Sequence, residues 1–343
     1  MTAVELGLDT FGDVTLDGDG QPVSHGQAIR NLVEQAVLAD SVGVDFIGVG
    51  EHHRREYAVS SPEIVLAAIA AQTERIRVGT AVTVLSSDDP VRVYERFATL
   101  DAISGGRAEI ILGRGSFTES FPLFGYDLGD YEALFEEKLE LFSLLRSEKP
   151  VTWQGTTRAR LDAADVFPKT PNGIRAWVGV GGSPESVIRT ARYGYGLMLA
   201  IIGGPAPRFR PYVDLYHRAV GELGTEAQPI GMHSPGHIAD TDEQAWEEAY
   251  PGFEAQNNTI GRERGWPAYS RLRFQQEVGP EGSIYAGSPE TVARKMVASI
   301  RALGVDRFDL KYANGTLGHD KLMRSVELYG TRVIPMVRDM LAD

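Results

Sequence analysis

Cysteine is absent from the 343 residues of this sequence. Its absence excludes disulfide bridges, thiolate metal sites and a cysteine nucleophile. Long apolar runs are absent too, and no stretch reaches the roughly 18 residues that a transmembrane helix needs. The first residues lack a basic stretch followed by an apolar core, so no signal peptide is expected. We therefore expect a cytoplasmic protein with no membrane partner.

Positive charge is scarce relative to negative charge. The chain has 34 Lys and Arg against 47 Asp and Glu, which gives a formal net charge of −13. Nucleic-acid binding depends on clustered Lys and Arg, so nucleic acid is not an expected partner. Hydrophobic residues make up 43% and charged residues 24% of the chain, as in ordinary globular proteins.

Strand-like and helix-like segments alternate along the whole chain. Apolar and β-branched residues predict eight strands, at 4–11, 44–49, 77–85, 107–112, 176–180, 197–202, 230–239 and 308–312. This alternation implies parallel strands with right-handed crossovers. No linker of Pro, Gly and Ser divides the chain, so one domain spanning 1–343 is expected. The sequence predicts an α/β fold, a (βα)8 TIM barrel with insertions, and a doubly wound open sheet is the alternative.

The segment 242–287 contains many turn-forming residues, among them Pro251, Asn257 and Gly279. It follows the seventh expected strand, and loops after barrel strands lie over the catalytic mouth. We therefore expect an irregular insertion that acts as an active-site lid. Three of its aromatic residues are candidates for lining the pocket beneath it: Trp266, Tyr269 and Phe274.

Glu51, His52 and His53 follow directly after the second expected strand. A barrel builds its site from the carboxyl ends of its strands, although an ordinary solvated loop is the alternative here. Adjacent side chains in an extended backbone face opposite sides, so at most one imidazole faces the site. His233 and His237 are separated by Ser-Pro-Gly, which breaks the helix that a zinc pair at this spacing needs. No metal site is expected.

A glycine-rich turn, with Gly181, Gly182, Ser183 and Ser186, lies between the fifth strand and the next helix. Glycines let backbone N–H groups approach an anion, and the helix N-terminus adds free donors. Ser-Pro-Glu also begins two other expected helices, so a plain helix cap is the alternative. Arg114, which two glycines flank, is either a phosphate ligand or an ordinary surface arginine.

Taken together, these motifs resemble the luciferase-like flavin-dependent monooxygenase family. The resemblance covers about residues 3–240 and 285–335. The motifs that carry it, in chain order, are Glu51-His52-His53, Gly79-Thr80-Ala81, Asp89-Pro90-Val91-Arg92, Ile103-Ser104-Gly105-Gly106-Arg107, Gly113-Arg114-Gly115 and the turn at Ser183.

The resemblance implies a set of site residues. The side chains of Arg114, Ser183 and Ser186, with the backbone of Gly181 and Gly182, would hold the 5′-phosphate of FMN. The pair Ala81 and Val82 would be joined by a cis peptide bond behind the isoalloxazine ring. His52, with Glu51 beside it, would act as the acid and base near the flavin C4a adduct. Gly113 stands where the family has a reactive cysteine, so light emission is not expected.

The resemblance also implies an activity. Reduced FMN would react with O2 to give a flavin C4a-hydroperoxide, which would oxidise a small organic substrate that the sequence does not identify. No nicotinamide fingerprint is present, so a separate NAD(P)H:flavin reductase would supply the reduced FMN. A homodimer is expected. Two alternatives stay open, namely an F420-dependent oxidoreductase of the same superfamily and a flavin-free binding homologue without catalysis.

Overall fold

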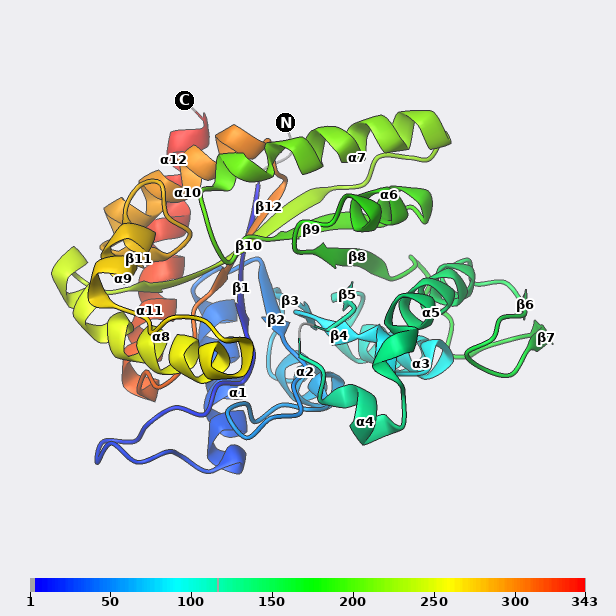
Figure 1. Cartoon of the computed structure of the whole chain (residues 1–343), viewed down its shortest axis with the longest axis horizontal. Coiled ribbons are helices and arrows are strands. Elements are labelled where there is room, and N and C mark those ends of the chain that lie inside the picture. Colours follow the sequence, from blue (N-terminus) through cyan, green and yellow to red (C-terminus); the bar gives the residue numbers. More distant parts are fainter. Residues whose placement is uncertain (1–3, 116, 343) are drawn as a thin grey trace.

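Eight parallel strands close into a barrel in the computed structural model, which describes residues 4–115 and 117–342 (Figure 1). In barrel order the strands are β1 (Glu5–Thr10), β2 (Phe46–Val49), β3 (Arg77–Thr80), β5 (Ala108–Gly113), β8 (Arg175–Val180), β9 (Gly196–Ala200), β10 (Ile230–Ile238) and β12 (Arg307–Lys311). Pairing of β9 with β10 and of β12 with β1 completes the ring. The predicted TIM barrel is confirmed, and the open sheet is wrong.

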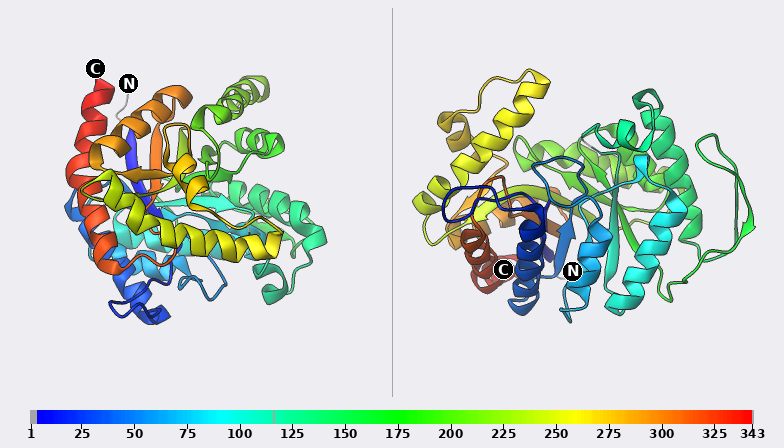
Figure 2. Two further views of the ribbon diagram at one scale, coloured as in Figure 1. Left: turned by 60° about the vertical axis from the view of Figure 1, so that its left-hand side comes forward. Right: turned by 90° about the horizontal axis from the view of Figure 1, so that it is seen from below.

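Helices surround this barrel (Figures 1 and 2). They are α1 (His25–Ser41), α2 (Pro62–Ala70), α3 (Pro90–Ser104), α5 (Tyr131–Leu145), α6 (Pro184–Arg192), α7 (Arg210–Leu223), α10 (Pro289–Leu303), α11 (His319–Leu328) and α12 (Ile334–Ala342). The side chains of Ser183 and Ser288 cap α6 and α10 as predicted, whereas Ser61 makes no such hydrogen bond. None of the helices that the structure describes is long and apolar enough to cross a membrane.

The third strand is interrupted at the barrel mouth. The sequence predicts one strand over 77–85, whereas β3 ends at Thr80 and the short β4 covers only Thr83–Val84. The peptide bond between Ala81 and Val82 is cis, as the resemblance implied. The hydroxyl of Thr83 donates to that of Thr80 at 3.0 Å, which bridges the interruption.

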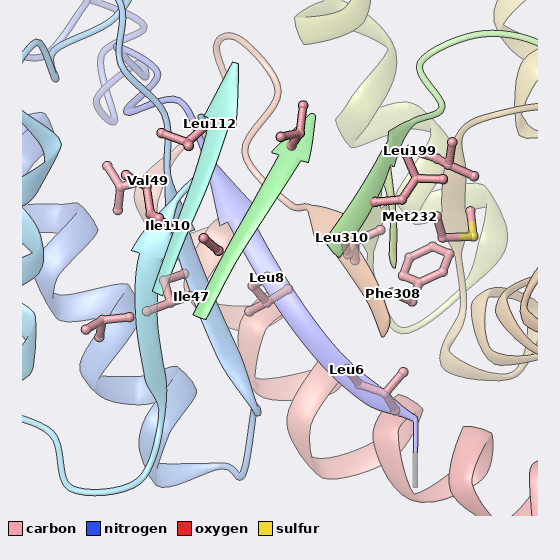
Figure 3. Close-up of a cluster of buried hydrophobic side chains, with 14 of the residues drawn as sticks. Leu6, Leu8, Ile47, Val49, Ile110, Leu112, Leu199, Met232, Phe308 and Leu310 are labelled. Atoms are coloured by element: carbon pink, nitrogen blue, oxygen red, sulfur yellow. The ribbon is translucent and has the colours of Figure 1, made fainter. Parts of the chain in front are cut away.

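Barrel strands place alternate residues in two different environments. Leu6 and Leu8 of β1 belong to the large apolar layer between the strands and the helices (Figure 3). The residues between them face the interior, where a Cβ on Gly7 would collide with the carboxylate of Asp309. Asp9 shares this face and is fully buried. The barrel interior therefore contains charged and small residues, together with a separate apolar cluster of Phe46, Ile111, Trp177 and Met198.

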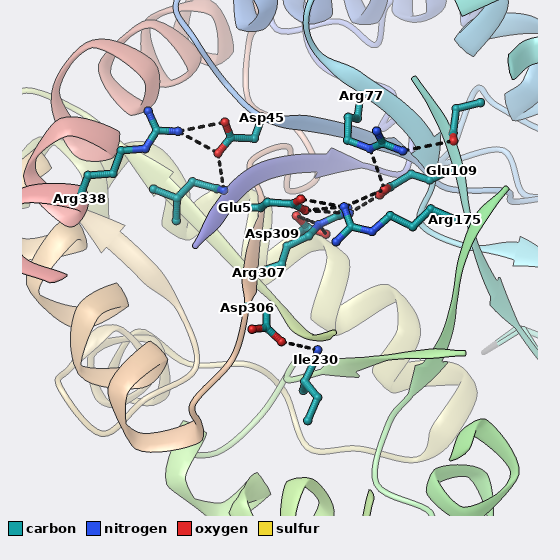
Figure 4. Close-up of polar contacts among 12 residues, drawn as sticks. Glu5, Asp45, Arg77, Glu109, Arg175, Ile230, Asp306, Arg307, Asp309 and Arg338 are labelled. Carbon is teal, nitrogen blue, oxygen red and sulfur yellow. Dashed lines mark hydrogen bonds and ion pairs between the residues drawn. The ribbon is translucent and has the colours of Figure 1, made fainter. Parts of the chain in front are cut away.

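Ion pairs fill the floor of the barrel, at the amino ends of its strands (Figure 4). The fully buried Arg307 donates from Nε to both oxygens of Asp309, at 2.8 and 3.0 Å, and from Nη1 to Glu109. Glu109 also contacts Arg77 at 3.2 Å and Arg175 at 3.5 Å. Burial raises the pKa of Asp309 to about 6, although Arg307 opposes this. This network takes part of the space that aliphatic side chains fill in most such barrels, and the Arg307 guanidinium packs on the ring of Phe46 at 3.5 Å.

The segment 242–287 is largely helical, so the prediction of an irregular insertion is wrong. It contains α8 (Asp242–Arg264), α9 (Arg271–Val278) and β11 (Tyr285–Gly287), which pairs with β10. Pro251 lies inside α8. Packing overrides the turn-forming residues, because the segment has its own apolar core of Ala249, Phe253, Tyr269, Phe274, Val278, Ile284 and Ala286.

This small core changes the expected roles of the aromatic residues. Tyr269 and Phe274 are only 3% and 1% exposed and pack within the segment, so they do not line a pocket beneath it. Trp266 is 45% exposed. Lys295 of α10 fixes the end of α9, since its ammonium donates to the carbonyls of Gly279 at 2.6 Å, Val278 at 3.2 Å and Ile284 at 2.8 Å.

Candidate active site

A polar cradle lies at the carboxyl ends of β5 and β8, which are neighbours in the barrel. Arg114 follows β5, and Ser183 and Ser186 begin α6 after β8. Ser183 Oγ accepts a hydrogen bond from the backbone N–H of Ser186 at 3.3 Å. The Ser186 hydroxyl itself is buried without a hydrogen-bond partner among the described residues. No atom lies within 4 Å of the position that a Cβ on Gly181 would take, so the turn leaves open space.

Arg189 of α6 completes the cradle and was missed in the sequence. Its Nη2 donates to Glu132 at 3.1 Å, and its Nη1 is buried with no partner among the described residues. Arg114 donates to the other oxygen of the same Glu132. Two guanidinium groups and a free hydroxyl form a donor set that suits a phosphate. The i, i+3 spacing of Ser186 and Arg189 on one helix was the available signal.

The backbone at Gly182 is held in a conformation that favours glycine. Its φ is +119°, and the hydroxyl of Tyr212 donates to its carbonyl at 2.8 Å. The turn before α6 is therefore fixed by a side chain of α7, which a reading of the local sequence could not anticipate.

The side chain of Val82 fills a notch between two glycines. A Cβ on Gly113 would collide with Cγ2 of Val82, and one on Gly179 would lie 3.3 Å from its Cγ1. Val82 therefore occupies the space that a side chain at position 113 would need. This packing explains why glycine stands at the position where the resemblance places a cysteine.

His52 lies in a cluster of aromatic rings at the barrel mouth. Its ring centroid is 4.7 Å from that of Phe11, 4.4 Å from that of Tyr57 and 5.3 Å from that of Phe117. Burial, helped by the charge of Lys311, lowers the pKa of His52 to about 3. The imidazole is therefore neutral near pH 7, and a pKa this low makes it a weak base in these surroundings.

His53 and Glu51 form a separate pair. His53 Nε2 lies 3.0 Å from Glu51 Oε1, and the second Glu51 oxygen accepts the backbone N–H of Val84 at 2.8 Å. The two adjacent imidazoles thus have different surroundings. Both carboxylate oxygens of Glu51 are engaged in fixing β4 and His53, which is the geometry of a positioning group.

A second imidazole in the barrel mouth was missed in the sequence. Nδ1 of His233 lies 2.6 Å from Oδ2 of Asp9, and the other Asp9 oxygen is buried without a partner among the described residues. The His233 ring stacks on Phe11, with centroids 6.2 Å apart and planes 15° apart. Phe11 thus contacts both His233 and His52. The alternation of β1 could have placed Asp9 in the interior once Leu8 was assigned to the outer face.

His237 has a different partner from His233. Its Nε2 lies 2.8 Å from Glu248 of α8. In the part of the chain that the structure describes, no group of three or more His, Asp and Glu side chains is placed to hold a metal ion.

Helix α8 reaches the loop that follows β2. Arg54 Nη1 donates to Glu263 at 3.0 Å, and the same guanidinium donates to Glu119. Gln256 donates to the hydroxyl of Tyr57 at 2.9 Å, and Tyr57 belongs to the ring cluster around the buried imidazole. The segment 242–287 is therefore in direct contact with the candidate active site.

A closed α/β barrel with an anion cradle and buried titratable groups at one mouth is the arrangement of a barrel enzyme. The chain belongs to the luciferase-like monooxygenase family, whose sequence pattern matches residues 10–307. A related protein is the 4-hydroxyprotoasukamycin monooxygenase of Streptomyces nodosus subsp. asukaensis. It is 28% identical over 337 residues, which cover 90% of this chain and 87% of the relative.

Two solved structures show the same fold. One is the oxygenating constituent of 3,6-diketocamphane monooxygenase from Pseudomonas putida in complex with FMN, with a TM-score of 0.78, 20% identity and coverage of 98% and 99% of the two chains. The other is an F420-dependent secondary alcohol dehydrogenase, with a TM-score of 0.76, 18% identity and coverage of 98% and 100%. Proteins of this fold thus include both flavin- and F420-dependent enzymes.

Proposed function

We propose that the chain is a monooxygenase that uses reduced FMN and O2 to oxidise a small organic substrate. The observation that carries the proposal is the cradle at Arg114. There the Ser186 hydroxyl and one Arg189 nitrogen are buried with no partner among the described residues, beside an open turn at Gly181. Buried donors without partners are costly, and a bound phosphate satisfies them. These residues therefore fit the phosphate end of FMN.

FMN, when bound, supplies the electrons with which O2 is activated. The protein contributes the rest. Arg114, Ser183 and Ser186 bind the phosphate, with the backbone of Gly181 and Gly182 beside them. The backbone at Ala81–Val82 supports the ring system.

The ring cluster around His52 supplies an apolar wall that excludes water from the reacting atoms. His52 would accept the proton that the substrate releases, once negative charge on a bound ligand has raised the pKa of its imidazole. Glu51 positions this loop through His53 and β4.

FMN is favoured over F420 because the cradle is compact and suited to one terminal phosphate. The test is to purify the protein, add each cofactor, and record the absorption spectrum and native mass. Binding of F420 in preference to FMN would indicate that the protein is an F420-dependent oxidoreductase, which transfers hydride. Binding of neither, with no oxygen uptake when reduced FMN and substrates are added, would identify a non-catalytic homologue. A separate flavin reductase, a homodimeric state and a cytoplasmic location belong to the same proposal.

Replacement of Arg114 by alanine is expected to weaken FMN binding by about tenfold or more. A charge-assisted hydrogen bond to phosphate is worth about 1.5–3 kcal/mol, and about 1.4 kcal/mol corresponds to tenfold. Flavin fluorescence titration measures the change. Arg192→Ala is the matched control, because Arg192 lies on α6, is 53% exposed and, among the described residues, forms an ion pair with Glu136 alone. Equal FMN affinity in wild type and Arg114→Ala would remove Arg114 from the site.

We also propose that α8 and α9 act as the lid of the site. Arg54 links α8 to the mouth through Glu263 and Glu119. Arg54→Ala is expected to open this contact and to speed limited proteolysis within 242–287 several-fold. Arg55→Ala is the control, since Arg55 is 89% exposed and its one ion pair within the described part of the chain is with Glu56. Cleavage at the same rate in both variants would contradict the idea that Arg54 holds the lid. Mass spectrometry of the fragments locates the first cut.

A further inference from the structure

A second cationic cavity lies at the floor of the barrel, at the opposite end from the candidate active site. It has a volume of about 310 Å³ and is lined by Arg77, Gly106, Ala108, Arg146, Asn172, Gly173, Ile174 and Arg175. Arg77 and Arg175 are the first residues of β3 and β8. The same two strands carry the Ala81–Val82 bond and the Ser183 turn at their other ends.

Three guanidinium groups face this cavity, and no acidic residue is among those that line it. Arg77 donates from Nε to Glu109 and from Nη2 to a carbonyl, and Arg175 donates from Nη1 to Glu5. Each therefore keeps at least one terminal nitrogen with no bond to the described residues. The chain carries a net charge of −13, whereas this cavity is lined by positive charge.

The carboxylates nearby are already shared among several arginines. Burial acts to raise the pKa of Glu109, but Arg307, Arg175 and Arg77 together lower it, so this group is ionised in the folded protein. Glu5 also pairs with Arg175 and Asp309 with Arg307, so three carboxylates offset Arg77, Arg175 and Arg307. The excess positive charge at the cavity therefore comes from Arg146.

The ion pairs at the barrel floor account for the positions of Arg77 and Arg175, whereas Arg146 takes no part in these pairs. Arg146 caps the end of α5, and its side chain donates from Nε to the carbonyl of Ile174 at 3.3 Å and also hydrogen-bonds to the hydroxyl of Tyr195. It has no carboxylate partner there, and its guanidinium stacks on Tyr195 at 4.7 Å. A half-buried arginine that is held in place yet has unused donors is suited to an anionic ligand.

Two glycines keep the cavity open. Gly106 and Gly173 have φ values of +87° and +69°, and no atom lies within 4 Å of the position of a Cβ on either. An oxyanion can therefore approach the backbone as well as the three arginines. The side chains of Arg77 and Arg175 are 29% and 28% exposed, so solvent reaches them.

We propose that this cavity is a second anion site, which binds a phosphate group held by Arg77, Arg146 and Arg175. The arginine fork matches the oxygens of a phosphate, and three such groups from separate elements suit a multivalent oxyanion better than a single carboxylate. The ligand is either free phosphate or the phosphate of a small metabolite. The site goes beyond the proposed monooxygenase function and does not depend on it.

The test is calorimetric titration of inorganic phosphate into the protein saturated with FMN, at constant ionic strength. Because FMN occupies the cradle at Arg114, the titration is expected to show one phosphate bound per chain, at the floor cavity. Arg146→Gln is expected to weaken it by about tenfold or more, the effect of losing one charge-assisted contact. Arg210→Gln, on the exposed face of α7, is the control and should leave the affinity unchanged. Adenosine monophosphate, titrated in parallel, binds more tightly than phosphate if the natural ligand is a metabolite.

Absence of phosphate binding to the FMN-saturated protein, or equal affinity in wild type and Arg146→Gln, overturns the proposal. If FMN does not bind at all, the same titration is made on Arg114→Ala, in which the cradle has lost one guanidinium, and the added effect of Arg146→Gln reports on the floor site. The proposed monooxygenase function and the proposed floor site can therefore be contradicted independently of each other. Circular dichroism checks that Arg146→Gln folds, and Arg146→Lys, which keeps the charge but loses the fork, should show a smaller loss.

Discussion

Replacement of His52 by alanine is expected to lower turnover about 100-fold or more, the usual scale for a lost acid or base, with little change in FMN affinity. The imidazole is buried among Phe11, Tyr57 and Phe117 and is neutral near pH 7. It would accept a proton once negative charge on a bound ligand raises its pKa, in a site that excludes water. Single-turnover oxidation with reduced FMN, once a substrate is found, measures the loss.

His53→Ala is the matched control for this experiment. His53 contacts Glu51 and Phe124 and takes no part in the ring cluster of its neighbour. Its replacement should act mainly on stability, through the loop that Glu51 fixes. Equal turnover losses in the two variants would mean that the wrong imidazole has been assigned to the site. Full turnover in His52→Ala would leave His233, paired with Asp9, as the proton acceptor.

The pH dependence provides a second readout for His52. Its pKa falls from 6.5 in the unfolded chain to about 3 in the folded protein. Between these values the unfolded state binds more protons, so this group lowers stability as the pH falls from about 6.5 towards 3. The His52→Ala variant is therefore expected to lose less stability on acidification than wild type does. The activity profile of wild type should show no step near 6.5 from this residue.

Replacement of Arg307 by methionine is expected to lower the free energy of unfolding by about 3–5 kcal/mol. The variant leaves Glu109 and Asp309 buried without their main partner, and a buried charge without a partner is costly. Urea unfolding followed by circular dichroism measures the change. Arg338→Met is the control, because Arg338 is 46% exposed and pairs with Asp45 at the surface. Its loss should be about 0–1 kcal/mol. A similarly small loss for Arg307→Met would show that the floor network contributes little to stability.

The barrel could be predicted because its signals are local. Apolar alternation marks the strands, helical periodicity marks the helices, and serines such as Ser288 mark helix starts. The helix α8 could not be predicted in this way. Pro251 and the Asn and Gly residues of the segment favour turns locally, whereas burial of Phe253 against Phe274 decides for a helix. That contact joins residues whose proximity only the folded chain reveals.

The residues of the candidate site were also predictable only where the local sequence marks them. Motif residues such as Arg114 and Ser183 could be found because a short glycine-rich turn marks each of them. Asp9 and His233 are 224 positions apart, and no feature of either local sequence points to the other. Their pairing depends on the closure of the barrel, which brings β1 and β10 to either side of β12.

The packing of Val82 against Gly113 determines which substitutions position 113 can accept. A cysteine at position 113 collides with the valine, so it is accessible only after position 82 has become smaller. The order of the two substitutions is therefore constrained. Replacement of Gly113 by cysteine alone is therefore expected to destabilise the fold, unless Val82 is first replaced by a smaller residue.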